Sequence, residues 1–134
     1  MSQANVEAFK RGIEAYNRRD IEPMLKASHP ECEWYPFTAQ VEGNEAYHGH
    51  EGIRRWWANL DAAFEEFEVS VDQVRDLGDV VVALGRLRSR SRSGVTLDTE
   101  VGWMIRYRDG LAVWGRNYRT HAETLVAAGL RSNR

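Results

Sequence analysis

The feature that most constrains the fold is a change of hydrophobic period near the middle of the chain. Up to about Phe67, apolar residues recur at steps of three and four, which is typical of helices buried on one side. From Glu68 onward apolar and polar residues alternate, which indicates strands. Ser93-Gly94 and Asp109-Gly110 interrupt this alternation as tight-turn sequences. The second half therefore predicts strands joined as hairpins, near 68–75, 80–92, 95–107 and 111–119.

Most of the remaining chain predicts helices. Residues 4–17 form an amphipathic helix, whose apolar side holds Val6, Phe9, Ile13 and Tyr16. Asp20 is placed to cap a second, short helix, and Pro23 falls in its first turn, where a missing N–H costs nothing. Near the end of the chain, Thr120 to Glu123 fits a capping box and predicts a short helix over 122–128.

Between the early helices and the hairpins, the sequence predicts a short strand, a loop and the longest helix. Residues 31–37 alternate and place Cys32, Trp34 and Pro36 on one face. Residues 38–50 are polar and contain two glycines, which predicts a loop. Residues 51–67 keep helical spacing and predict a helix with one heavily aromatic buried side.

The composition excludes several classes of protein. With 134 residues, 43% hydrophobic and 28% charged, the chain is not disordered, and we expect one domain over 1–134. The net charge of −2 argues against nucleic acid or a membrane surface as a partner, and no apolar run is long enough to span a membrane. The first residues lack a signal-peptide pattern, so we expect a cytoplasmic protein. The single cysteine, Cys32, excludes an intramolecular disulfide, and no metal site is predicted.

The two turns decide which side chains share a face of the predicted sheet. If each turn has two residues, Leu84 lies opposite Trp103 and Ile105 lies opposite Trp114. One face then combines bulky aromatic residues with arginines: Arg86, Arg88, Trp103, Trp114, Arg116 and Tyr118. A packed core does not bury guanidinium groups without partners, so this face is predicted to curl around a wet or ligand-filled cavity. A β-bulge at Gly85 would instead turn the first two arginines outward.

The inward arginines are candidate substrate-binding residues. A planar guanidinium group suits a carboxylate, a phenolate or a polarised carbonyl. We therefore predict that Arg86, Arg88 and Arg116 bind the polar end of a ligand. The alternative is a solvated strand end, because the arginine pattern continues at Arg90 and Arg92.

Aromatic residues are candidates for the rest of the site. Trp34, Trp57 and Trp103 are predicted to form walls for a flat, apolar ligand, with ordinary core packing as the alternative. Tyr118 is predicted to bind substrate and, with Tyr16, to donate a hydrogen bond to a substrate oxygen.

Catalytic residues are not identified by the sequence. The candidates are His29, which could act as a general base near neutral pH, and the hydroxyl groups of Tyr16 and Tyr118. For the histidine the alternative is a loop residue before Pro30, and for the tyrosines it is a core position with the hydroxyl satisfied.

Several short motifs occur in an order that resembles a known superfamily. They are Ala15–Asp20 after the first helix, His29–Glu31 before the first strand, Tyr47–Ile53 at the start of the long helix, Arg106–Gly110 at a hairpin, and Ala127–Leu130. Together with the order of elements, they make nearly the whole chain similar to the nuclear transport factor 2-like superfamily. The closer similarity is to its SnoaL-like branch, which is named after a polyketide cyclase.

This resemblance implies a cone-shaped α+β barrel. In it, a curved mixed or antiparallel sheet wraps around a long helix and two N-terminal helices, with a pocket between sheet and helices. The resemblance also implies a homodimer through the outer face of the sheet. In the ketosteroid isomerase pattern an Asp base ends the first strand and a second acid lies on the sheet. This chain has Pro36 and Trp103 at the matching positions.

Two functions follow, and the sequence leaves open whether the protein is an enzyme. The first is binding of a small apolar molecule that carries an oxyanion or a carbonyl, in an aromatic pocket that contains arginine. Any turnover would be of the cyclase, isomerase or hydrolase type, without a cofactor. The alternative is a non-catalytic dimeric binding or accessory domain, because the inward acid is missing and the fold alone does not select an activity.

Overall fold

The computed structural model describes residues 2–37 and 46–130, so 38–45 of the predicted loop lie outside the described residues. The helices are α1 (Ser2–Arg18), α2 (Ile21–Lys26), α3 (Gly49–Ala63) and α4 (His121–Ala127). The strands are β1 (Ser28–Tyr35), β2 (Tyr47–His48), β3 (Phe64–Asp76), β4 (Val80–Ser91), β5 (Thr96–Arg108) and β6 (Leu111–Tyr118). None of the described helices is both long and apolar enough to cross a membrane.

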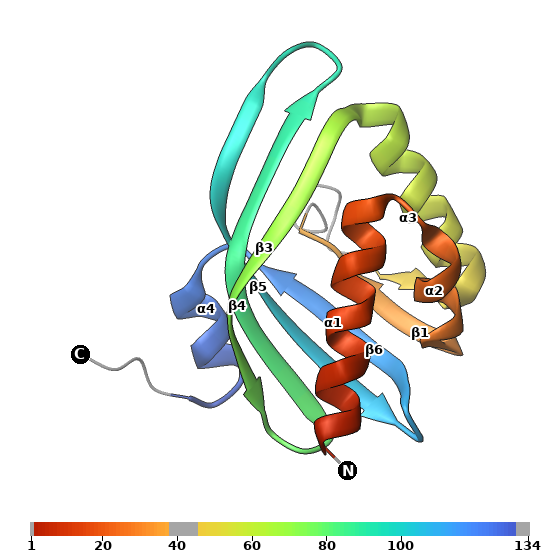
Figure 1. Ribbon diagram of the computed structural model, residues 1–134, viewed down its shortest axis with the longest axis vertical. Coiled ribbons are helices and arrows are strands. Elements are labelled where there is room, and N and C mark those ends of the chain that lie inside the picture. Colours follow the sequence, from red (N-terminus) through yellow and green to blue (C-terminus); the bar gives the residue numbers. More distant parts are fainter. Residues whose placement is uncertain (1, 38–45, 131–134) are drawn as a thin grey trace.

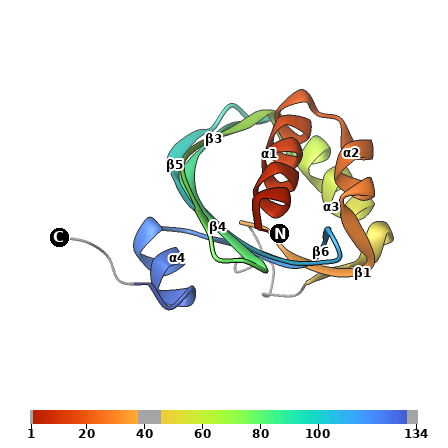
Figure 2. The same ribbon diagram turned by 60° about the horizontal axis from the view of Figure 1, so that its bottom comes forward.

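The strands form one curved sheet that does not close into a full barrel (Figure 1). Its order is β2-β1-β6-β5-β4-β3, with β1 and β6 parallel and the other neighbours antiparallel. Figure 2 shows the sheet bending around α1, α2 and α3, while α4 lies on its convex side. The predicted α+β class, with a curved mixed sheet around a long helix and two N-terminal helices, is therefore confirmed.

Local capping explains where the short helices begin and end. Asp20 accepts a hydrogen bond from the Glu22 N–H at 3.3 Å and starts α2. At α4 the Glu123 N–H donates to Thr120 Oγ1 at 3.0 Å, as the capping box predicts. Gly129, with φ of 75°, then ends this helix in a left-handed turn.

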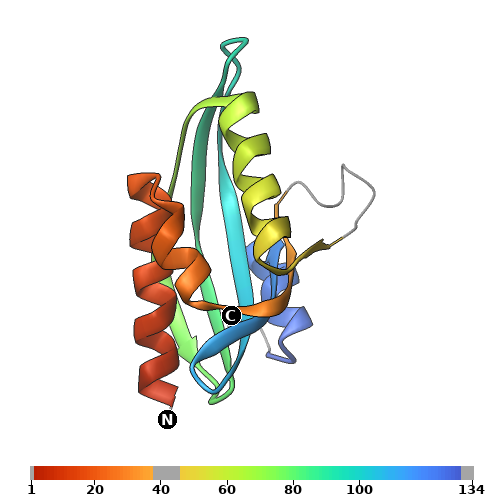
Figure 3. The same ribbon diagram turned by 90° about the vertical axis from the view of Figure 1, so that its right-hand side faces the viewer.

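Helix α3 ends at Ala63, four residues before the predicted end at Phe67. The hairpin between β4 and β5 causes this early end. The Arg92 N–H donates to the Ala63 carbonyl at 3.1 Å, and the Arg92 guanidinium donates to the Asp61 carbonyl at 3.0 and 2.7 Å. These donors satisfy carbonyls at the end of the helix. Figure 3 shows this end of α3 beside the upper part of the sheet.

The register of the sheet differs from the prediction at the turn between β4 and β5. The Ser91 N–H donates to the Val95 carbonyl at 2.8 Å, so the connection has three residues rather than two. Each position of β4 therefore faces a different partner, and Ala83, not Leu84, lies opposite Trp103. Because side chains alternate, this one-residue shift moves a whole set of β4 side chains to the other face. The pairing then runs unbroken from Val80 to Arg90, so no bulge at Gly85 in β4 is involved.

A second shift lies in β6. The Asp109-Gly110 turn has two residues, as predicted, since both have positive φ and Arg108 lies opposite Leu111. In the next two pairs, Tyr107 faces Ala112 but Arg106 faces Trp114, so one residue of β6 is extra. This is a β-bulge, and it places Gly115 rather than Trp114 opposite Ile105.

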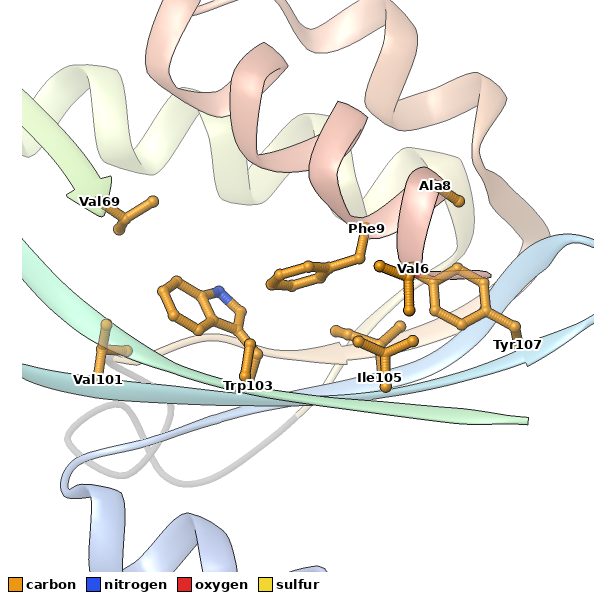
Figure 4. Close-up of a cluster of buried hydrophobic side chains, with 10 residues drawn as sticks. Val6, Ala8, Phe9, Val69, Val101, Trp103, Ile105 and Tyr107 are labelled. Carbon is orange, nitrogen blue, oxygen red and sulfur yellow. The ribbon is translucent and has the colours of Figure 1, made fainter. Parts of the chain in front are cut away.

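The corrected register gives the concave face an apolar surface. Its buried residues include Val81 and Ala83 from β4, and Val101, Trp103, Ile105 and Tyr107 from β5. Figure 4 shows Phe9 of α1 reaching toward Trp103, with the other β5 side chains on the same side. A second cluster, Leu25, Cys32, Ile53 and Trp56, packs between α2, α3 and β1.

On the convex face, α4 packs against a position without a side chain. A methyl group at Gly102 of β5 would overlap the Thr124 side chain of α4, which is fully buried. We therefore predict that Gly102→Ala destabilises the protein by about 1–3 kcal/mol through overpacking. Urea unfolding would measure this loss, and Thr96→Ala, an exposed change in the same strand, would serve as the control. Equal stability of the two variants would contradict this packing.

Candidate ligand cavity

A cavity of about 250 Å³ lies between the concave face of the sheet and the three N-terminal helices. Its walls are largely apolar and aromatic, and they include Phe9, Tyr16, Trp34, Trp56, Trp103 and Tyr107. The cavity exists because the sheet curves away from α1 and α3, so the two clusters of buried residues do not fill the whole space between them.

Helix α1 forms one wall by its spacing. Phe9, Gly12, Ile13 and Tyr16 all line the cavity, at the steps of three and four that share one helix face. The Phe9 ring meets the Trp103 ring edge-on, with centroids 5.7 Å apart. Tyr16 stacks against Trp56 at 6.1 Å, which links this wall to α3.

Strand β1 and helix α3 form the opposite wall. The Trp34 and Trp56 rings contact each other at 5.3 Å between centroids. The Trp34 ring also lies against Gly115 of β6, where a methyl group would approach Ile105 Cδ1 at 2.8 Å and the Trp34 ring at 2.9 Å. The missing side chain at Gly115 therefore lets the indole lie close to the sheet and leaves the cavity open.

The polar groups in the wall are neutral. Burial raises the pKa of the Tyr16 and Tyr107 hydroxyls well above their ordinary value, although nearby Arg19 and Arg11 act in the opposite direction. Both phenols are therefore protonated at neutral pH and can donate a hydrogen bond. The described residues provide no partner for the Tyr16 hydroxyl or for the buried Trp34 Nε1. Burial likewise raises the pKa of the Cys32 thiol, which disfavours a thiolate.

Charged side chains are nearly absent from the described part of the lining, where Glu33 is the one charged residue. Glu33 alternates along β1 with Cys32 and Trp34, whose side chains pack inward. Its carboxylate therefore belongs to the outer face of the sheet. The described lining consequently contains no inward pair of an acid and a base.

Arg86 and Arg88, which were predicted to face the pocket, lie on the outer face of β4. This correction follows from the longer turn between β4 and β5. Arg86 forms an ion pair with Asp98 of β5, and Arg88 forms one with Glu68 of β3, both at 2.9 Å. Their side chains are 45% and 54% exposed, so each pair adds at most about 1 kcal/mol to stability.

Arg116 and Tyr118 were also predicted to line the pocket, and they too lie on the outer face. The bulge in β6 is the reason. The Arg116 guanidinium lies over the Tyr35 ring at 5.0 Å and the Tyr118 ring at 5.8 Å.

Trp57 and His29 are the other predicted site residues that do not line the cavity. Trp57 lies behind its wall, where its ring meets Tyr16 and Phe67 at 5.8 Å. His29 accepts a hydrogen bond through Nδ1 from the Glu31 N–H at 3.0 Å, a local contact at the start of β1.

Of the predicted site residues, the structure brings Tyr16, Trp34 and Trp103 together around the cavity. Phe9 and Trp56 also line it, although neither was predicted to be a site residue. Their helical spacing was the available signal, but it does not distinguish a cavity wall from a packed core. Gly12 also lines the cavity and was not predicted to do so. The available signal was a glycine within the apolar face of a helix.

Largely apolar, concave cavities of this kind are where proteins usually bind small molecules. Residues 9–114, more than half of the chain, match the SnoaL-like domain family, and the chain therefore belongs to that family. No curated protein sequence matches the chain.

Solved structures have the same fold. An NTF2-like protein of unknown function from Burkholderia pseudomallei has a TM-score of 0.80 and 22% identity, over 92% of this chain and 95% of that one. TerC, crystallised with polyporic acid, has a TM-score of 0.79 and 24% identity, over 95% of this chain and 97% of that one. A putative SnoaL-like polyketide cyclase from Jannaschia sp. has a TM-score of 0.74 and 22% identity, over 87% of this chain and 85% of that one. The predicted SnoaL-like, nuclear transport factor 2-like fold is confirmed.

The buried phenols predict how stability depends on pH. Unfolding returns Tyr16 and Tyr107 to the ordinary pKa of 10.0, so the unfolded chain loses these protons first as the pH rises. The contribution of these two buried hydroxyls to the free energy of unfolding is fully present below pH 10.0 and is lost as the pH rises above it. We expect the urea midpoint to fall between roughly pH 9 and pH 11, and to fall less in Tyr16→Phe/Tyr107→Phe.

The control for this experiment is Tyr35→Phe, which removes a phenol from the outer face and leaves both buried phenols in place. It should lose stability at high pH as the wild type does. If the double variant and the wild type show the same alkaline loss, the two hydroxyls are not buried as described.

Proposed function

We propose that this SnoaL-like domain binds a small, largely apolar, neutral molecule that carries a carbonyl group. The observation that carries this proposal is a cavity with aromatic walls, whose described lining has neutral hydrogen-bond donors and no inward charge. The ligand expected from the sequence carried either an oxyanion or a carbonyl. With the arginines on the outer face, the carbonyl is the better match.

The size of the cavity limits the ligand. An engineered apolar cavity of about 150 Å³ binds benzene. The cavity here, at about 250 Å³, is larger and suits a molecule of two fused rings. Apolar contact with Phe9, Trp56 and Trp103 would supply most of the binding free energy.

The polar end of the ligand would meet Tyr16. Its hydroxyl keeps its proton at neutral pH and has no hydrogen-bond partner among the described residues, so it could donate to a ligand carbonyl. A carboxylate is a poorer match, because a buried anion without a cation loses more hydration than one phenol can replace.

Binding, rather than turnover, is the activity that the described lining supports. Proton transfer at carbon requires a base within hydrogen-bond reach of the substrate. Glu33 faces outward, and both buried tyrosines hold their protons, so these groups can polarise a carbonyl but cannot accept a proton. This favours the non-catalytic alternative over a cyclase, isomerase or hydrolase.

Calorimetric titration with a matched pair of compounds tests the proposal. We expect 1-acetonaphthone, a neutral ketone, to bind at least about tenfold more tightly than 1-naphthoate, its charged analogue. Tyr16→Phe should weaken ketone binding about fivefold, the effect of one neutral hydrogen bond. Polyporic acid, with which TerC was crystallised, serves as a third probe.

The control is Arg86→Ala, which should leave both affinities unchanged because Arg86 pairs with Asp98 outside the cavity. Tighter binding of the carboxylate, lost in Arg86→Ala, would contradict the proposal and restore an arginine pocket. If no probe binds, an accessory domain without a ligand becomes the better account.

We further propose that the protein is a homodimer, formed through the outer face of β5 and β6. Beside α4, this face and the adjoining end of β1 carry partly exposed side chains that are large and apolar or aromatic: Tyr35, Met104, Trp114 and Tyr118. Aromatic, methionine and arginine residues of this kind are enriched in interfaces between subunits.

A charge on this face should separate the subunits. We expect light scattering to give twice the chain mass of 15.4 kDa for the wild type and one chain mass for Tyr118→Glu. Glu68→Lys, a charge change near the opposite edge of the sheet, is the control and should stay dimeric. A monomeric wild type at micromolar concentration would contradict the dimer.

A further inference from the structure

We infer that Gly12 sets the size of the ligand that the cavity accepts: its missing side chain provides the space for the second ring of a neutral aromatic ketone. This inference rests on the proposed ligand binding. It adds a residue that determines specificity within the same cavity.

Gly12 is unlike the other described glycines. Gly49, Gly78, Gly94, Gly110 and Gly129 have positive φ, where a side chain would be strained. At Gly52, Gly85, Gly102 and Gly115, a methyl group would approach another atom within 3.0 Å. Gly12 has neither property, because its φ is not positive and, apart from its chain neighbours and its own helix backbone, no heavy atom lies within 4 Å of the position a Cβ would take.

Helix formation does not explain a glycine at this place either. Gly12 lies in the interior of α1, where glycine is less stable than alanine because it orders a more flexible backbone. A methyl group there would also bury apolar surface in the cavity. Both effects favour alanine, so the glycine costs stability and leaves space that the protein itself does not fill.

The space beside Gly12 lies where a bound ligand would be expected. It lies three residues after Phe9 and four before Tyr16, and all three line the cavity on one face of α1. A ketone that accepts a hydrogen bond from Tyr16 would therefore place its rings against the bare backbone at Gly12 and the edge of Phe9. One helix face would supply a donor, an open surface and an aromatic contact.

The test compares two ketones of different size in variants of one position. In the wild type we expect 1-acetonaphthone, with two rings, to bind more tightly than acetophenone, with one. Gly12→Ala should raise the thermal midpoint of unfolding, yet lower the affinity for 1-acetonaphthone about tenfold, the effect of one methyl group in a tight pocket. The affinity for acetophenone should stay within about twofold, so the selectivity reverses or disappears.

Gly12→Leu extends the series and should abolish binding of the two-ring ketone. Ala4→Leu, at an exposed position of the same helix, is the control and should keep the selectivity of the wild type. A loss of binding in Gly12→Ala would not result from misfolding, because alanine favours the helix and a higher thermal midpoint would show that the fold is intact.

Failure of this inference differs from failure of the proposed function. If the wild type binds 1-acetonaphthone and Gly12→Ala binds it equally well, Gly12 does not set ligand size, although the cavity still binds ligands. If the wild type binds neither ketone by calorimetry, the proposed ligand binding fails and this inference fails with it.

Discussion

The pairing of β4 with β5 determines what the concave side of this protein can do. With three residues in the connecting turn, Ala83 lies opposite Trp103, and the small and apolar residues of β4 face inward. Their neighbours along the strand, Arg86 and Arg88, then face outward to acidic residues on the two adjacent strands. The length of one turn, three residues rather than two, thus decides that the concave face is apolar and that the charged side chains lie on the outer face.

Other arginines also bind acceptors outside the cavity. Arg90 bonds to both Glu65 and Glu66, while Arg19 and Arg92 donate to main-chain carbonyls around the junction of α3 and β3. A guanidinium group can make several such hydrogen bonds at once, which an ammonium group does less well. These arginines therefore bind acceptors outside the cavity, and its described lining keeps neutral donors.

The sequence predicted the elements better than the contacts between them. Capping at Asp20 and Thr120, and the turn at Asp109-Gly110, are local chemistry and were confirmed. The end of α3 depends on Arg92, a residue distant in sequence, and the extra residue in β6 depends on pairing with β5. Tyr16, Trp34 and Trp103 line the cavity, whereas Arg86 and Arg88 lie on the outer face, because strand alternation carries one error in turn length along an entire strand.

Nuclear Overhauser effects between β4 and β5 test this account most directly, because they report which residues lie opposite each other. The account predicts backbone contacts between Ala83 and Trp103 and between Gly85 and Val101. Contacts between Leu84 and Trp103 and between Arg86 and Val101 would contradict it, since Arg86 and Arg88 would then share the face of Trp103 and the cavity would be lined by charge.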